Sequence, residues 1–246
     1  MNLLLDLGNS RLKWAFADDK LGTVHSRAWA VPGAVDGLRA EWNCSAPPAR
    51  VLVASVAPPS CRERIAGLLA QLAWPQGEWL RSPARMGRLR NAYSVPADLG
   101  IDRFLAMLAA LDENQAPCVI ASCGTALTLD ALQADGRHLG GQIAPGIQAM
   151  LTGLGRAAPG LPDPGPGTCD AFAHATSDAM RAGVWQASAA AIERFADLAA
   201  QRMQVMPRLL LCGGNAAATA SLLRRTHEPF EHAVLRGLHA WLRLLG

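Results

Sequence analysis

Residues 1–19, MNLLLDLGNSRLKWAFADD, decide the fold of this chain. An apolar run over Leu3–Leu5 is followed by one carboxylate, Asp6, and then by the turn-forming residues of 8–10. An alternating apolar pattern resumes over Leu12–Ala17, which is typical of a half-buried strand. The stretch therefore predicts two antiparallel strands, Leu3–Leu7 and Leu12–Ala17, joined by a tight turn that begins beside an acid.

The same design recurs in the second half of the chain. An apolar strand over Val119–Ala121 leads into a turn at Gly124 and Thr125, and a second strand follows over Leu127–Leu132. Gly140-Gly141 and Pro145-Gly146 bracket a third strand, which we expect to begin at Gln142–Ile143. The repeat predicts two similar α/β domains with a boundary near Gln115–Pro117. We expect a ligand in the cleft between two such halves.

Other segments fill in both halves. A β-branched run predicts a strand over Val51–Val56, and helical spacing of apolar residues predicts helices over Ser60–Leu72 and Ile101–Leu111. Helices are also expected over about 176–203, after a Pro/Gly-rich loop between Ala158 and Gly167. The stretch RLLLCGGNAAATASLL predicts a strand, a Gly-Gly turn and a helix.

Composition excludes several classes of protein. Half of the 246 residues are hydrophobic and 17% are charged, so the chain can bury a core. No apolar run reaches the roughly 18 residues that cross a bilayer. The first residues lack the basic start of a signal peptide, so we expect a soluble, cytoplasmic protein.

Charge and cysteine content indicate neither nucleic-acid binding nor a zinc site. The net charge is +3, and the one basic cluster, Arg81, Arg85, Arg88 and Arg90, has no interleaved aromatic residues, which favours a solvated surface. The six cysteines form no CxxC pair, and we expect them to be reduced.

Asp6 has two interpretations. An aspartate at a strand end can simply cap a turn by binding local N–H groups. Alternatively, the turn is a phosphate hairpin, in which Gly8 lets the backbone approach an anion and Asn9 and Ser10 donate hydrogen bonds. Lys13 would add a positive charge, and Asp6 would hold Mg²⁺, through water.

A second acid stands in NAYSVPADLGIDRFLAMLAAL, where Asp102 and Arg103 precede an apolar helix. Asp102 could be an ordinary helix cap and Arg103 a surface ion-pair partner. Taken together with the first hairpin, CGTALTLD, GGQIAPG and LCGGNA, however, these residues form one ordered series.

That series resembles the type III pantothenate kinases, which belong to the acetate and sugar kinase/Hsc70/actin superfamily. DLGNSRLKWA is similar to the first phosphate motif of the family, and YSVPADLGIDR matches its most specific signature. GTALTLD matches its second phosphate hairpin, with GGQIAPG as the follow-on. TSDAMRAG resembles a pantothenate-binding segment, and CGGNA resembles the turn near the adenosine.

The resemblance implies two RNase H-like (actin-like ATPase) domains, 1–115 and 116–246, with an active-site cleft between them. It also implies phosphorylation of pantothenate to 4'-phosphopantothenate with Mg-ATP, the first step of coenzyme A biosynthesis, in a homodimer without nucleic-acid or membrane partners. Asp102 would be the general base. The ATP phosphates would be bound by Asp6, Leu7, Gly8, Asn9, Ser10, Arg11, Leu12, Lys13 and Thr125. Pantothenate would be bound by Tyr93, Gly100, Ile101, Asp102, Arg103 and Thr176.

One residue departs from the family pattern. Many members carry an acid two positions before the glycine of the second hairpin, where it binds potassium or ammonium, but this chain has Ser122 there. A neutral hydroxyl is a weak ligand for a hard cation, so a monovalent-cation site is doubtful at Ser122. Two alternative functions remain at this point: a kinase of the same superfamily acting on another small hydroxylated metabolite, and a non-enzymatic nucleotide-binding regulator of transcription.

Overall fold

The computed structural model describes residues 1–165 and 170–245. Its contacts group these residues into two compact units. Unit 1 comprises residues 1–114 and 232–246, and unit 2 comprises residues 115–231. Part of the predicted loop, including Gly167, lies outside the described residues, as does Cys169.

Unit 1 is built on a five-stranded sheet in the order β3-β2-β1-β4-β5. The first two strands form the predicted hairpin, in antiparallel register from Asn2 opposite Ala17 to Leu7 opposite Leu12, and β4 and β5 extend the sheet in parallel. The strands are β1 (Asn2–Leu7), β2 (Arg11–Ala17), β3 (His25–Ala28), β4 (Val51–Ser55) and β5 (Gly77–Trp79).

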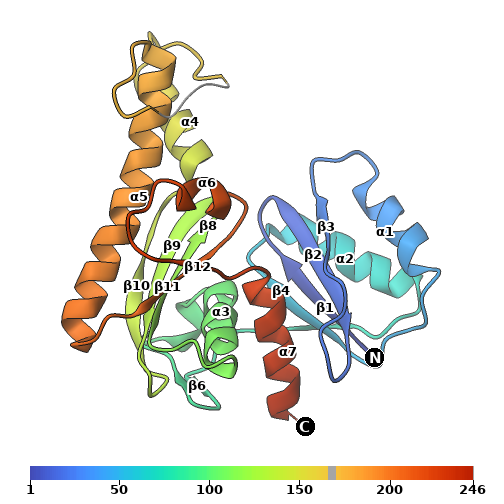
Figure 1. Ribbon diagram of the computed structural model, residues 1–246. Coiled ribbons are helices and arrows are strands. Elements are labelled where there is room, and N and C mark those ends of the chain that lie inside the picture. Colours follow the sequence, from blue (N-terminus) through green and yellow to red (C-terminus); the bar gives the residue numbers. More distant parts are fainter. Residues whose placement is uncertain (166–169, 246) are drawn as a thin grey trace. The chain divides into compact units, whose positions relative to one another are not determined.

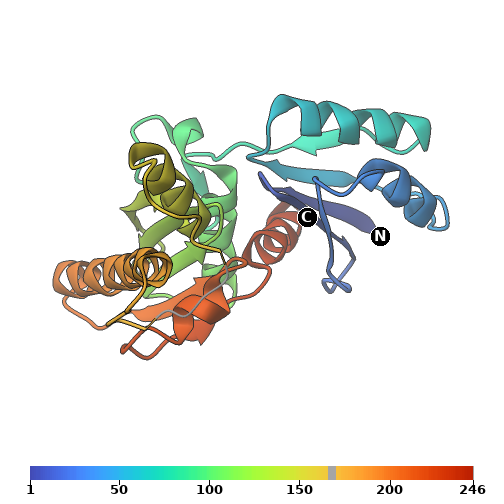
Figure 2. The ribbon, with the colours of Figure 1, turned by 90° about the horizontal axis from the view of Figure 1, so that it is seen from above.

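Helices cover both faces of this sheet (Figures 1 and 2). Leu3 and Leu5 of β1 belong to a buried cluster with Leu38 and Ile65, so α1 and α2 cover one face. Figure 2 shows α7 on the other side of the strands, where it contacts β1 and β2. The helices are α1 (Ala34–Trp42), α2 (Pro59–Gln71), α3 (Ile101–Asp112) and α7 (Ala233–Leu245). The remaining elements are β6 (Arg85–Met86), β7 (Leu89–Arg90) and the 3-10 helix η1 (Pro96–Asp98).

Unit 2 repeats the topology of unit 1. Its sheet has the order β10-β9-β8-β11-β12, again with an antiparallel hairpin followed by parallel neighbours. The third strand begins at His138, earlier than predicted, because a bulge between His138 and Gly140 takes the glycine pair into the strand. The strands are β8 (Cys118–Cys123), β9 (Ala126–Leu132), β10 (His138–Pro145), β11 (Arg208–Cys212) and β12 (Glu228–Pro229).

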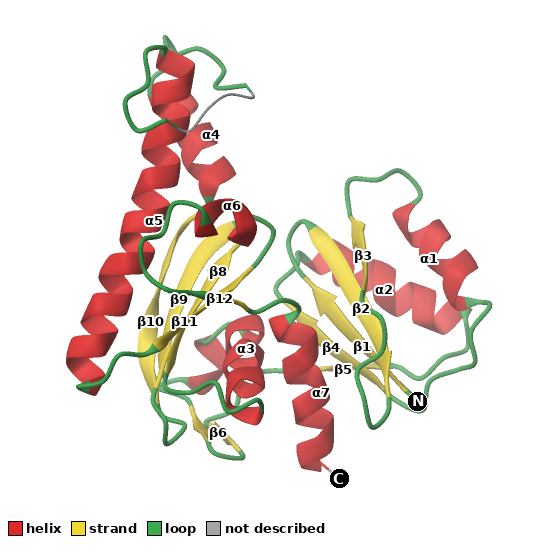
Figure 3. Ribbon diagram, in the orientation of Figure 1, coloured by secondary structure: helices red, strands yellow, loops and turns green. Residues whose placement is uncertain are grey.

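The helices of unit 2 are α4 (Ile147–Ala157), α5 (Thr176–Met203) and α6 (Ala216–Ala220). Ile192 and Ala199 of α5 pack in the core formed by β8, β9 and β11. In Figure 3, α4 and the N-terminal end of α5 project beyond this sheet. A separate apolar cluster, which includes Leu151, Met180 and Val184, joins these two helix segments.

The sequence predicts domains 1–115 and 116–246, and it therefore assigns the C-terminal helix to the second domain. In the structure α7 belongs to unit 1. Trp241 packs edge-to-face on Phe104 of α3, with 6.1 Å between ring centroids, and Arg236 forms an ion pair with Glu113. Burial of this apolar face against α3 and β1 gives the physical reason, because a helix is held where its apolar stripe finds a partner.

None of the helices in the described residues is both long and apolar enough to cross a membrane. The five cysteines in the same part of the chain are not in disulfide bonds.

Candidate functional site

The turn between β1 and β2 presents polar groups to solvent. Leu7 and Leu12 are fully buried and fix its two ends, whereas Asn9, Ser10 and Arg11 are exposed. The turn is closed by a hydrogen bond of 3.0 Å from the Gly8 N–H to the Arg11 carbonyl oxygen. The anchored ends and exposed tip are the arrangement that a phosphate hairpin requires.

Trp29, which follows β3, binds the same turn. Its indole Nε1 donates to the carbonyl oxygen of Gly8 at 2.8 Å, and its backbone N–H donates to the carbonyl oxygen of Ser10 at 3.1 Å. The Arg64 guanidinium lies 5.8 Å from the centroid of the indole ring. Two carbonyl oxygens that would repel an anion are thus engaged by protein. Sequence analysis missed Trp29, and no local pattern identifies it.

Asp6 faces Lys13 across the hairpin, as residues paired in register. The side chain of Asp6 is partly accessible, but protein surrounds its carboxyl closely enough for desolvation to raise its pKa to about 7. Lys13 opposes this rise in pKa, and the charge of Asp102 adds to it. Asp102, 96 positions away in the sequence, therefore lies near enough to Asp6 in unit 1 for its charge to affect the pKa of Asp6.

Asp102 sits in the first turn of α3. Its Oδ1 accepts a hydrogen bond of 2.9 Å from the Arg103 backbone N–H, which holds the carboxylate at the start of the helix. A Cβ on Gly100 would lie 2.6 Å from that Oδ1, so this carboxylate position requires glycine at 100. Ile101 is buried and anchors the turn.

Arg103 is 6% exposed and points to Tyr93. Its Nη1 donates to the Tyr93 hydroxyl at 2.9 Å, and its guanidinium carbon lies 5.8 Å from the centroid of that ring. Asn91 accepts a hydrogen bond of 3.0 Å from the Tyr93 backbone N–H and donates to the carbonyl oxygen of Pro96 at 3.0 Å. The predicted pair Tyr93 and Arg103 is therefore brought together, with Asn91 as a further residue that fixes it.

The second hairpin, between β8 and β9, carries Thr125 at its exposed tip. The Gly124 N–H donates to the Ala126 carbonyl oxygen at 3.0 Å, and the Gly146 N–H donates to the Thr125 carbonyl oxygen at 3.1 Å. A Cβ on Gly146 would lie 2.3 Å from the Gly124 carbonyl oxygen. The backbone before α4 therefore packs directly on the hairpin, and only glycine permits this approach.

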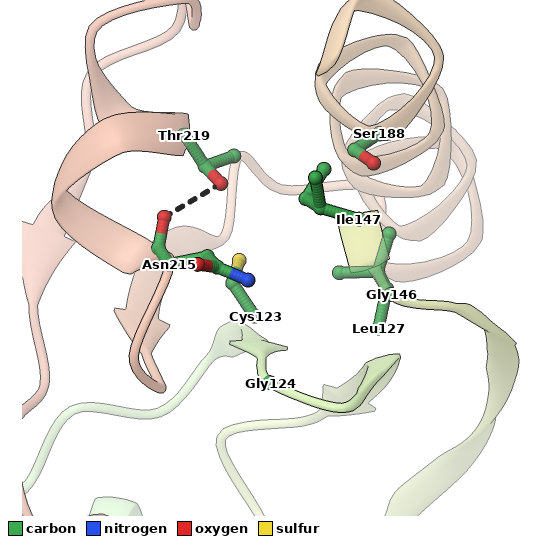
Figure 4. Close-up of a pocket in the computed structure, with 8 residues that line it drawn as sticks. All are labelled: Cys123, Gly124, Leu127, Gly146, Ile147, Ser188, Asn215 and Thr219. Carbon is green, nitrogen blue, oxygen red and sulfur yellow. Dashed lines mark hydrogen bonds between the residues drawn. The ribbon is translucent and has the colours of Figure 1, made fainter. Parts of the chain in front are cut away.

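A small pocket lies beside this hairpin (Figure 4). It is bounded by Gly124 and Gly146, by Ser188 of α5, and by Asn215 and Thr219 near α6. Thr219 Oγ1 donates to the Asn215 carbonyl oxygen at 2.8 Å. The lining also includes Cys123. Burial raises the pKa of its thiol, and a hydrogen bond with Thr219 lowers it by a smaller amount.

Two predicted residues of unit 2 stand apart from the hairpin tip. Ser122 lies within β8, where its cross-strand partners, Thr128 and Cys212, carry no charge. Thr176 is exposed and begins α5, twelve residues before Ser188, which corresponds to about 18 Å along a helix. The structure thus does not bring Thr176 to the second hairpin.

Asp6 and Asp102 are the residues of the candidate site in unit 1 that could hold a divalent cation. Among the described residues no cluster of three or more His, Cys, Asp or Glu side chains could hold a metal ion. Two neighbouring carboxylates nevertheless suit Mg²⁺, which is usually held by one or two carboxylates together with substrate phosphates and water. The donor set of unit 1 therefore fits magnesium brought in with a nucleotide.

Comparisons with known proteins identify the family to which this chain is similar. The family model for type III pantothenate kinases matches residues 2–198. The type III pantothenate kinase of Nitrosospira multiformis is 35% identical over 247 residues, covering 98% of this chain and 90% of that protein.

Solved structures share the fold. A conserved protein of the Baf family of transcriptional activators from Campylobacter jejuni has a TM-score of 0.60 at 20% identity, with 98% of this chain and 97% of that chain covered. Component A of (R)-2-hydroxyglutaryl-CoA dehydratase from Acidaminococcus fermentans has a TM-score of 0.57 at 11% identity, with 100% and 99% covered. Together with the two similar sheets, these matches confirm the predicted fold class, α/β with two similar domains.

Proposed function

Because this chain belongs to the type III pantothenate kinase family, we propose that it transfers the γ-phosphoryl group of ATP to the primary hydroxyl of pantothenate. The product would be 4'-phosphopantothenate, which enters coenzyme A biosynthesis. The observation that carries the proposal is that unit 1 holds both the candidate phosphate hairpin, closed by the hydrogen bond from Gly8 to Arg11, and a candidate base, Asp102, whose carboxylate is fixed by the Arg103 N–H.

In this proposal Asp102 is the general base. The hydrogen bond from the Arg103 N–H to its Oδ1 fixes the carboxylate, which would accept the proton of the pantothenate hydroxyl as the hydroxyl oxygen attacks phosphorus. Phosphoryl transfer passes through a loose transition state, and its catalysis depends mainly on positioning and on stabilising charge. A base fixed by its own helix turn meets the first of these requirements.

Residues 6–13 would hold the phosphates of ATP. The exposed side chains of Asn9 and Ser10 and the adjacent N–H groups supply hydrogen-bond donors, and Lys13 supplies positive charge. Thr125 of the second hairpin would contribute a further hydroxyl. Magnesium bound at Asp6 would neutralise charge on the phosphate oxygens.

For pantothenate, we propose binding by Tyr93, Gly100, Ile101, Asp102 and Arg103. The hydrogen bond between Arg103 and Tyr93 fixes the guanidinium, so less side-chain entropy is lost when it binds a ligand. Thr176 lies in unit 2, and we propose that it binds pantothenate in a homodimer whose second subunit completes the pocket.

Release of ADP in a coupled assay, measured with and without pantothenate, tests the function. We expect turnover only with pantothenate present, and formation of a phosphorylated product detectable by mass spectrometry. Turnover with a sugar instead would support another kinase of the superfamily. Nucleotide binding without turnover on any acceptor would support the regulator.

The same assay tests the base. Asp102→Asn should lower kcat by about 10²–10⁴-fold while ATP binding is retained, because loss of a positioned base costs about that much. Asp36→Asn is the matched control, since Asp36 is another first-turn aspartate, in α1 of the same unit. Near-normal kcat in Asp102→Asn would show that Asp102 is not the base.

A further inference from the structure

A polar pocket of about 220 Å³ lies in unit 1 beyond the residues that the proposed function uses, apart from Gly100 and Ile101. It opens at the carboxyl ends of β4 and β5, between the residues that follow these strands and the start of α3. Because Ser55 is paired with Leu7 in parallel register, the pocket occupies the same sheet edge as the phosphate hairpin. Ligands of open α/β sheets bind at this edge.

One wall of the pocket carries a polar group without a partner. The Oγ of Ser55 is buried, and no atom of the described residues forms a hydrogen bond with it. Buried hydroxyls are almost always hydrogen-bonded in folded proteins, and an unsatisfied one costs about 1–3 kcal/mol. A polar ligand in the pocket would satisfy it.

The pocket is also lined by two arginines. The Arg62 guanidinium stacks on Trp79, 4.7 Å from the ring centroid, and Arg81 is the second arginine of the lining. Neither forms an ion pair with a carboxylate among the described residues, whereas the nearby Arg50 is paired with Glu78. Asp98 is the acidic residue of the lining, which leaves a net positive charge.

The structure separates Arg81 from the other arginines of its sequence cluster. Arg85 donates to the Gly87 carbonyl oxygen, and Arg88 donates to that of Leu111. Neither lines the pocket. The N-terminus of α3, at Gly100 and Ile101, adds the positive end of a helix dipole to the charge of the arginines.

We propose that this pocket binds the anionic group of a small metabolite, a carboxylate or a phosphate, between Arg62, Arg81 and the Ser55 hydroxyl. The carboxylate of pantothenate is the first candidate, and this choice rests on the proposed function. The pocket reaches the residue before Asp102, so an acceptor with its hydroxyl at Asp102 can extend its other end towards the arginines. The second source is a separate anion that binds beside the acceptor.

Kinetics with two acceptors distinguish whether the pocket binds the carboxylate of pantothenate or a separate anion. KM is measured for pantothenate and for pantothenol, in which an alcohol replaces the carboxylate, with wild type, Arg81→Gln, Ser55→Ala and the control Arg85→Gln. We expect Arg81→Gln to raise KM for pantothenate about tenfold, which corresponds to loss of one charged hydrogen bond, and to leave KM for pantothenol unchanged. Ser55→Ala should act in the same direction, and Arg85→Gln should match wild type.

Calorimetry with inorganic phosphate tests the second source without turnover. Phosphate binding that is lost in Arg81→Gln but kept in Arg85→Gln, with unchanged KM for pantothenate, would assign the pocket to a separate anion. Unchanged KM together with unchanged phosphate binding in Arg81→Gln would overturn the proposal. A wild-type protein inactive on pantothenate would refute the proposed function alone, because the phosphate titration still tests the pocket.

Discussion

The indole Nε1 of Trp29 donates a hydrogen bond of 2.8 Å to the carbonyl oxygen of Gly8, the glycine of the turn between β1 and β2. The backbone N–H of Trp29 holds the Ser10 carbonyl oxygen at the other side of the same turn. One residue, 21 positions from Gly8, thus fixes these two carbonyl groups of the candidate phosphate hairpin, and we propose that it positions the hairpin for ATP.

Trp29→Phe should raise KM for ATP more than it lowers kcat. The phenyl ring keeps most of the packing but loses the N–H donor, and one hydrogen bond is worth about 0.5–1.5 kcal/mol, or about 2- to 12-fold in affinity. Trp42→Phe is the control, because Trp42 Nε1 is buried with no hydrogen-bond partner in the part of the chain that the structure describes. Equal KM values for ATP in Trp29→Phe and wild type would refute the positioning role.

The raised pKa of Asp6 predicts that the metal-free fold loses stability as pH rises. The pKa is 3.8 for the ordinary group and about 7 in the folded state, so folding favours the protonated carboxyl. This contribution to stability is complete below pH 3.8 and is lost as pH rises to about 7. Between pH 5 and pH 8 the loss is at most about 3 kcal/mol, counted over the two pH units from 5 to about 7.

Denaturant unfolding at pH 5 and pH 8, without magnesium, measures this effect. Asp6→Asn is neutral at both pH values, so the difference between its two unfolding free energies should be smaller than in wild type. The variant isolates Asp6 from other titrating groups. A pH dependence that is identical in the two proteins would show that the Asp6 carboxyl is not desolvated in the fold.

Gly146→Ala should destabilise unit 2 and weaken ATP use. The added Cβ would lie 2.3 Å from the Gly124 carbonyl oxygen and 2.6 Å from that of Thr125, so the second hairpin must move. Overpacking of this kind typically costs about 1–3 kcal/mol. The matched control is Gly153→Ala in α4, where nothing lies within 4 Å and alanine favours the helix by about 1 kcal/mol. Thermal unfolding of both variants tests this prediction. Equal Tm values would contradict the close approach of Gly146 to the second hairpin.

The neutral surroundings of Ser122 predict weak or absent dependence on monovalent cations. Its cross-strand neighbours carry no charge, and the nearest acid along β9, Asp130, is hydrogen-bonded to His138 at 2.9 Å. Activity in potassium, ammonium and a bulky organic cation at matched ionic strength should therefore be similar, since affinity for hard cations follows ligand charge. A steep loss in the organic cation would mean that a site persists on other oxygens, and Ser122→Asp should then strengthen it.

The sequence by itself determined both hairpins and most of the regular elements. Apolar alternation and glycine turns are local signals, and they predicted β1, β2, β8 and β9 to within one or two residues at each end. The short strand β3 (HSRA) has no apolar alternation, and β5 has three residues, so neither strand could be predicted from a two-residue apolar period. The helices α1 and α7 were likewise not predicted, and α7 owes its place to packing against α3.

Only the tertiary structure decided which distant residues act together. Motif order and resemblance named Asp6, Asp102, Arg103 and Tyr93, but no spacing in the sequence predicts that the charge of Asp102 raises the pKa of Asp6. The Trp29 contact with Gly8 and the pocket lined by Arg62 and Arg81 could not be predicted from the sequence for the same reason. Local periodicity records which face of an element is buried, whereas hydrogen bonds and charge coupling depend on how the sheet brings separate strand ends to one edge.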